Sequence, residues 1–218
     1  MFYRVDANRL SFREYWRWRP GIPFLFLAVQ KILGIRRSTG QRYERPETLV
    51  SIDAHDLPDR HRSVLDPLTA QASSLGFALQ FYYSVPSVGR IRGVAAALTS
   101  TDRLSLLLLI HSTPKNALRP AQPAYALYSC AADGRILATS GGLPGLISAA
   151  PEIHVLRIRH GSLDETWQRH STRTSGESLV PFRAEAVADW LLRLLQRNFD
   201  YNVGRGVYVP CPEYDSHY

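Results

Sequence analysis

The chain has 218 residues, a length that suits one domain, and its 45% hydrophobic content argues against a disordered protein. The two cysteines, Cys130 and Cys211, form no spaced motif, which argues against a disulfide framework or a zinc site and favours a reducing compartment. Residues 1–45 hold ten arginines and lysines against three acidic residues, whereas residues 46–218 hold sixteen of each sign. The formal net charge of +7 therefore belongs to the N-terminal segment alone.

Residues 8–19 predict a short helix, with Asn8 or Ser11 as its cap. An apolar run, IPFLFLAVQKILGI, follows over residues 22–35. As a helix it would reach about 21 Å, short of the roughly 30 Å of a bilayer core, and Gln30 and Lys31 interrupt it. We therefore expect no transmembrane span. A signal peptide also fits poorly, because the run begins late and no small-residue cleavage site follows it.

Three interpretations of this segment stay open. The first, which we favour because strongly apolar helices are usually buried in their own fold, places the run over the open face of the protein's own sheet. The second places it in a membrane interface, since tryptophans and arginines flank it. The third is nucleic-acid binding, which gives the apolar run no role and lacks a basic face spread over the fold. The residues expected to contact a membrane or a protein partner are Trp16, Arg17, Trp18, Arg19, Phe24, Phe26, Arg36 and Arg37.

The rest of the chain is organised around an antiparallel meander over residues 76–158. Residues 77–85 alternate so that Phe77, Leu79, Phe81, Tyr83 and Val85 share one face, the pattern of a half-buried strand. Residues 86–89 predict a turn, and residues 90–99 a second strand. Residues 104–110 are apolar on both faces, which predicts a central strand covered on both sides.

The second half of the meander is expected to begin with a hairpin. Gly134 can take the positive φ of a tight turn between strands over residues 125–129 and 135–140. A last strand over residues 154–158 would turn Leu156 and Ile158 one way and Arg157 the other, toward water.

Three helices are expected around this sheet. Asp66 and Pro67 read as a helix start, and Ser162 with Glu165 matches a capping box. The final helix carries the clearest periodicity, an apolar stripe formed by Val187, Trp190, Leu191, Leu194 and Leu195. We therefore predict an α+β fold in which an arm (residues 1–45) precedes one domain (residues 46–218) with an antiparallel meander sheet of five to seven strands and helices packed mainly on one face.

No pattern in the chain indicates a known reaction. The loop over residues 53–61 mixes carboxylates with His55 and His61, but at no spacing of a compact metal site. His170 lacks the second imidazole of a helical zinc pair, and Cys130 has no histidine near it in sequence. We expect no metal and no cofactor, and lean toward a protein that is not an enzyme. If a pocket exists between the meander and its helices, the candidates for its polar lining are Tyr82, His111, Tyr125, Arg157 and His170.

Three short motifs give a resemblance. They are SSLGF (residues 73–77), SCAADGRILATS (residues 129–140) and WQRH (residues 167–170). Together they resemble a set of uncharacterised bacterial proteins with an LGF strand start, a DGR-x-L-x-T-S hairpin and a late helical histidine. The resemblance covers roughly residues 70–172 and implies no activity.

These observations favour a non-catalytic cytoplasmic protein, attached through residues 1–45 to the inner membrane surface or to a protein partner. The alternative is a small-molecule-binding protein or enzyme with a pocket between sheet and helices. Nucleic acid is the least favoured partner.

Overall fold

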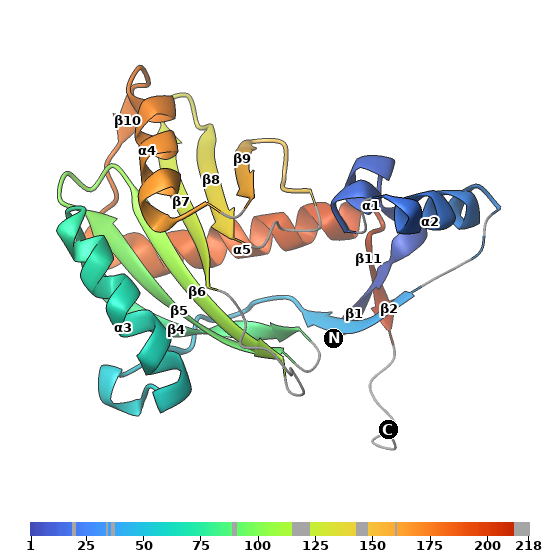
Figure 1. Cartoon of the computed structure of the whole chain (residues 1–218), viewed down its shortest axis with the longest axis horizontal. Coiled ribbons are helices and arrows are strands. Elements are labelled where there is room, and N and C mark those ends of the chain that lie inside the picture. The colour runs from blue at the N-terminus through green and yellow to red at the C-terminus, as the bar shows by residue number, and fades with distance from the viewer. Residues whose placement is uncertain are drawn as a thin grey trace.

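A computed structural model describes residues 1–18, 21–33, 35, 38–88, 91–114, 123–142, 148–159 and 161–211. It has an α+β fold with a large, mostly antiparallel sheet and a small second sheet (Figure 1). The elements in chain order are β1 (Phe2–Asp6), α1 (Phe12–Trp18), α2 (Ile22–Ile32), β2 (Ser38–Glu44), β3 (Ser51–Ile52), α3 (Asp59–Ser74), β4 (Phe77–Val88), β5 (Ile91–Ser100), β6 (Leu106–Pro114), β7 (Ala124–Ala131), β8 (Ile136–Gly142), β9 (Ile153–Arg159), α4 (Leu163–Thr174), β10 (Leu179–Val180), α5 (Val187–Gly204) and β11 (Tyr208–Cys211), with three short 3-10 helices at Ala7–Arg9, Ala54–Asp56 and Ala184–Ala186.

The large sheet has eight strands in the order β3-β4-β5-β6-β7-β8-β9, with β10 paired to the end of β7. This is slightly more than the five to seven expected, and the two-residue strands β3 and β10 are among the eight. The strands run antiparallel through β8, as the meander predicted. The last strand differs, because β9 lies parallel to β8 in the register Ile136↔Ile153.

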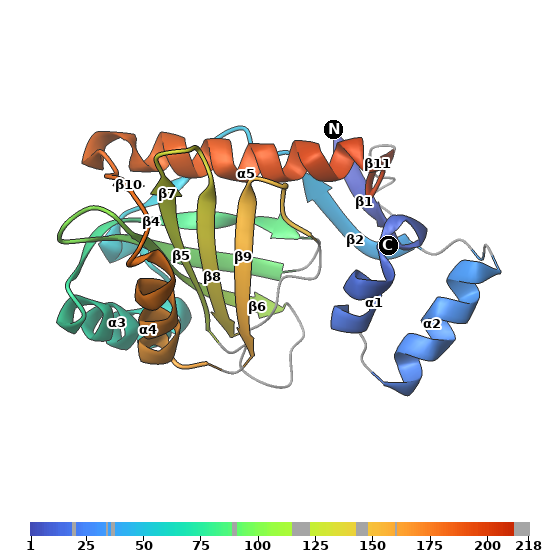
Figure 2. The same ribbon diagram turned by 90° about the horizontal axis from the view of Figure 1, so that it is seen from above.

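Helices cover both faces of this sheet, not mainly one. On one face α3 and α4 pack through Leu65, Ala72 and Leu163, and on the other α5 packs through Leu191 and Leu194. Figure 2 shows α5 crossing its face opposite α3 and α4. The expected central strand β6 is confirmed, since its leucines alternate between the two clusters and are all buried. We call these the α3/α4 face and the α5 face.

A bulge in β4 overturns the single apolar face expected for that strand. The pairing of β4 with β5 shifts between Leu79 and Phe81, and an extra residue in one strand reverses the direction of the side chains that follow. Phe77 therefore packs on the α3/α4 face, whereas Phe81 and Tyr83 pack on the α5 face. The strand also continues through Val88, past the turn expected at residues 86–89.

Local capping and turn signals are confirmed at two sites. The Ser162 hydroxyl accepts a hydrogen bond from the Glu165 backbone N–H at 3.2 Å, which starts α4, and Gly134 has a φ of 87° in the β7–β8 turn. The expected start of α3 at Asp66 is wrong, because α3 begins at Asp59 and holds Pro67 in its interior. There proline removes one helical hydrogen bond, a cost that the buried side chains of this helix offset.

The small sheet joins the two ends of the chain in the order β11-β1-β2. Val5 of β1 and Val207 just before β11 are buried in one cluster with Leu10 and Tyr15 of the α1 region. The helix α2 rests on this cluster through Phe24 and Leu27. Both views place α2 at the far end of the molecule from α3 and α4, so the apolar run does not cover the large sheet (Figures 1 and 2).

The position of α5 leads to a stability prediction. Replacing Leu194 with alanine is expected to reduce the free energy of unfolding by about 3 kcal/mol, because this side chain is 6% exposed within the core cluster of the α5 face. Urea denaturation measures the change. The control is Arg193→Ala on the exposed side of the same helix, which is expected to cost less than about 0.5 kcal/mol. Equal effects of the two substitutions would contradict this packing.

Candidate functional site

Of the five residues proposed to line a pocket, the structure brings Tyr125 and Arg157 to one cavity, and Tyr82, His111 and His170 do not line it. Tyr82 and Tyr125 pack in the cluster of the α3/α4 face. His111 and His170 also lie on that face, where each is buried in a separate polar contact. Arg157 lies on the α5 face beside Leu194 and Leu195. The expectation that Arg157 points to water is therefore wrong: the parallel strand β9 continues the sheet over α5, and α5 covers that side of it.

His111 forms a buried pair with His61 of α3. The two Nδ1 atoms are 3.1 Å apart, and the side chains are 3% and 1% exposed. Burial, with the charges of His111 and Arg60 nearby, lowers the pKa of His61 to about 4, and burial also lowers the pKa of His111. Both rings are therefore neutral at pH 7, so that one Nδ1–H donates to the other Nδ1. No local pattern in the sequence indicates this pair, because fifty positions separate the partners.

The buried His170 ring contacts two hydroxyl groups. The pair of a serine and a histidine resembles a catalytic dyad, but only in the types of residue. The His170 Nε2 is 3.0 Å from the Ser129 hydroxyl and its Nδ1 is 2.9 Å from the Thr139 hydroxyl. The Ser129 hydroxyl also donates to the Leu104 carbonyl at 2.8 Å. A nucleophilic serine needs access to substrate and a base oriented for proton transfer, yet Ser129, Thr139 and His170 are fully buried. This chain of hydrogen bonds satisfies buried polar atoms and stabilises the contact of α4 with β7 and β8.

A cavity of about 260 Å³ lies on the α5 face of the sheet. Its walls come from β6, β7, β8 and β9 on one side and α5 on the other. Most of the lining is apolar, and Arg157 is its only charged residue among those that the structure describes. The full lining is Ile110, Ala124, Tyr125, Ala126, Tyr128, Ala138, Thr139, Ser140, Ala149, Ile153, Val155, Arg157, Leu194, Leu195 and Asn198.

Arg157 stands among other cations. Its Nε is buried without a hydrogen-bond partner, and so is one Nη of Arg17 on α1. Burial lowers the pKa of Arg157, and the positive charges of Arg17 and Arg13 lower it further. The carboxylate that acts on it, Glu14, is bound by Arg205 at 2.8 and 2.9 Å and by two backbone N–H groups. The positive charges around Arg157 are therefore not balanced by a nearby carboxylate that is free to pair with them, within the described residues.

The second candidate surface is the outer side of α1 and α2. Four residues of the α2 region, Leu25, Val29, Ile32 and Leu33, are 62%, 53%, 74% and 68% exposed. Their spacing of four, three and one places them along one side of a helix. On the opposite side, the Lys31 ammonium donates to the carbonyl oxygens of Asn8 and Leu10. The helix thus turns its charged residue inward and its aliphatic residues outward.

The residues predicted to contact a membrane or partner have different positions. Trp16 is 46% exposed and contacts Phe24 edge to face, with ring centroids 5.2 Å apart. Phe24 and Arg17 are half-buried, and Phe24 packs inward on the cluster beneath α2. The side chains of Trp18 and Phe26, and residues Arg19, Arg36 and Arg37, lie outside the described part of the protein.

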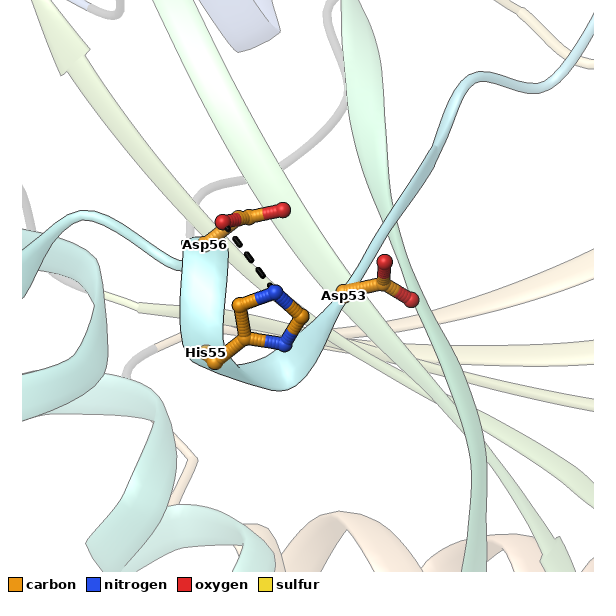
Figure 3. A group of neighbouring side chains, drawn as sticks. All are labelled: Asp53, His55 and Asp56. Atoms are coloured by element: carbon orange, nitrogen blue, oxygen red, sulfur yellow. Dashed lines mark ion pairs between the residues drawn. The ribbon is translucent and has the colours of Figure 1, made fainter.

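In the loop over residues 53–61, the side chains of Asp53, His55 and Asp56 lie close together (Figure 3). Their possible ligand atoms lie within 4.8 Å of one another, and the His55 Nε2 is 3.4 Å from a carboxylate oxygen of Asp56. All three are exposed. His61 from the same stretch is turned into the core instead. Within the part of the chain that the structure describes, no buried polar side chain orients the trio as the outer ligands of metal sites usually do, so we assign it no ligand.

Comparison with known proteins yields no match to a protein-family model, to a curated protein or to a solved structure. Among the described residues, no helix combines the length and the apolar character needed to cross a bilayer.

Proposed function

We propose that the protein attaches to an anionic membrane surface through the outer side of α1 and α2. The observation that supports this most directly is the orientation of α2, with Leu25, Val29, Ile32 and Leu33 exposed and Lys31 turned inward. Exposed aliphatic side chains that share one side of a helix are typical of helices that insert shallowly between lipid headgroups.

Charge favours an anionic lipid surface over a neutral one. Residues 1–45 carry the entire excess of positive charge in the chain. Arg13 is exposed on α1, close in sequence to the exposed Phe12 and Trp16. Each basic residue near an anionic bilayer contributes about 1 kcal/mol to binding, and tryptophan favours the headgroup region because its ring is apolar and its N–H is polar.

Co-sedimentation with vesicles tests the proposal. The double variant Ile32→Ser/Leu33→Ser is expected to bind vesicles of equal parts phosphatidylglycerol and phosphatidylcholine at least tenfold more weakly than the wild type. Each of these side chains would otherwise lose much of its water-exposed area in the headgroup region, and full burial of such a side chain contributes about 1.5 to 3 kcal/mol.

The matched control is Val50→Ser/Val180→Ser, which removes two similarly exposed aliphatic side chains far from α2 and is expected to bind like the wild type. Wild-type binding is also expected to weaken at high salt and on pure phosphatidylcholine. Equal vesicle binding by both double variants would overturn the proposal. If the wild type does not bind vesicles but forms dimers, and the Ile32→Ser/Leu33→Ser variant is monomeric, the surface is a protein interface instead.

A further inference from the structure

The cavity on the α5 face has two chemically distinct parts. Arg157 supplies its charge, and most of the remaining lining is aliphatic and aromatic, including Ile110, Val155, Leu194 and Leu195. A site of this kind is complementary to a molecule with an anionic group and an apolar chain. At about 260 Å³ the space lies just under the roughly 300 to 1,000 Å³ of typical ligand sites, which indicates a small ligand.

The charge around Arg157 is uncompensated within the described residues. The Arg157 side chain makes no hydrogen bond and no ion pair there, and its Nε is shielded from water. Arg157 is half-buried, and charges that are partly withdrawn from water are ordinarily paired. Arg13 and Arg17, one helical turn apart on α1, add positive charge nearby, while Glu14 is committed to Arg205. An anion bound here would supply the missing partner.

We propose that this cavity binds a medium-chain carboxylic acid, with the carboxylate paired to the Arg157 guanidinium and the alkyl chain between the sheet and α5. The planar guanidinium suits a carboxylate because two N–H groups can donate to its two oxygens. The exposed aliphatic residues of the membrane-attachment surface do not line this cavity, so the two proposals are tested by different variants.

Titration calorimetry with octanoate tests the site. We expect saturable binding of octanoate and at least tenfold weaker binding of octanol, which has the same chain without the charge. Across butyrate, hexanoate and octanoate, each added methylene is expected to tighten binding about fourfold, the equivalent of about 0.8 kcal/mol per buried CH₂. Equal binding of octanol and octanoate, or equal binding of inorganic phosphate and octanoate, would overturn the proposal.

Three variants test whether octanoate binds in this cavity or elsewhere on the protein. Arg157→Gln is expected to weaken octanoate binding at least tenfold, and Ala126→Leu, which fills the cavity from its buried β7 wall, is expected to abolish it. The control Arg193→Gln removes an exposed arginine on the far side of α5 and is expected to bind octanoate like the wild type. Loss of binding in Arg193→Gln, or unchanged binding in Arg157→Gln, would contradict the assignment.

Thermal melting shows whether Arg157→Gln remains folded. Because the Arg157 side chain makes no hydrogen bond within the described part of the protein, removing its charge is expected to leave the Tm unchanged or to raise it. A residue kept at some cost to stability is typical of a binding site. A marked fall in Tm would show that the guanidinium has a structural partner, and would overturn the site as described.

Discussion

Replacing Glu14 with alanine is expected to reduce the free energy of unfolding by about 3 to 5 kcal/mol, the usual cost of breaking a buried ion pair by removing one partner. The Glu14 side chain is 0% exposed and its two oxygens accept hydrogen bonds from the Arg205 guanidinium. The same oxygens accept from the backbone N–H groups of Ser11 and Ser148 at 2.6 and 2.7 Å. Without the carboxylate, both N–H groups lose their partner, and Arg205 retains the Asn202 side-chain oxygen but no anion.

Urea denaturation of Glu14→Ala against Asp200→Ala measures this effect. Asp200 pairs with Arg45 at 2.8 Å, but both side chains are about half exposed, so the control is expected to cost less than about 1 kcal/mol. A similar cost for both variants would show that the Glu14 pair is no more important than a surface contact.

The same carboxylate also predicts a pH dependence. Burial by itself would raise the pKa of Glu14, but hydrogen bonds from Arg205, Ser11 and Ser148 together lower it from 4.5 to about 2. A carboxyl whose pKa is lowered in the folded state stabilises the fold above its unfolded pKa. Its contribution is therefore complete above pH 4.5 and is lost as the pH falls toward 2. In Glu14→Ala this part of the acid dependence is expected to disappear.

A second large effect is expected at mildly acidic pH, from the buried histidines. Burial lowers the pKa values of His61 and His170 from 6.5 to about 4. Between pH 6.5 and about 4 these histidines are protonated in the unfolded chain but stay neutral in the folded protein. Their contribution to the free energy of unfolding is therefore complete above pH 6.5 and is lost as the pH falls to about 4. Each histidine contributes up to about 3 kcal/mol to this loss.

Chemical denaturation of His170→Gln at pH 7 and pH 4.5 tests this origin. The variant cannot titrate, so the fall in its free energy of unfolding between the two pH values is expected to be smaller than that of the wild type by about 2 kcal/mol. The control is His154→Gln, which removes an exposed imidazole on β9 and is expected to retain the wild-type difference. If His170→Gln also retains it, the Ser129–His170 chain is not the source of the acid sensitivity.

Features that depend on neighbouring residues could be predicted from the sequence. The leucine run of β6, the Gly134 turn, the Ser162 cap of α4 and the apolar stripe of α5 each follow from a pattern shorter than twenty residues, and each is confirmed.

Features that depend on distant partners could not be predicted. A single extra residue in β4 moved Phe77 to the opposite face from Phe81, and no periodicity announces such a bulge. The sequence around Pro67 predicts a helix start, but Pro67 lies in the interior of α3, a helix that buries several side chains. Arg157 faces α5 because of the register in which β9 pairs with β8, and no pattern within β9 itself predicts that α5 covers this side.

The candidate sites also combine features that the local sequence predicts with features that depend on distant residues. The cationic, apolar character of residues 1–45 was evident from composition. The inward turn of Lys31 was not, because it depends on carbonyl groups of residues 8 and 10. Likewise Glu14 is separated by 191 positions from Arg205. Long-range polar contacts of this kind leave no local pattern.

The pairing of β1 with β11 has a consequence for how the protein is made. On one side β1 pairs with β2, and on the other side its residues Phe2 to Val5 pair with Tyr208 to Cys211. Arg205 completes the buried ion pair with Glu14 of α1. Residues 2–5 are therefore synthesised long before the strand that pairs with them on this side. The small sheet and the cluster beneath α2 are incomplete until residues 207–211 have been made, so attachment through α1 and α2 is expected only after that point.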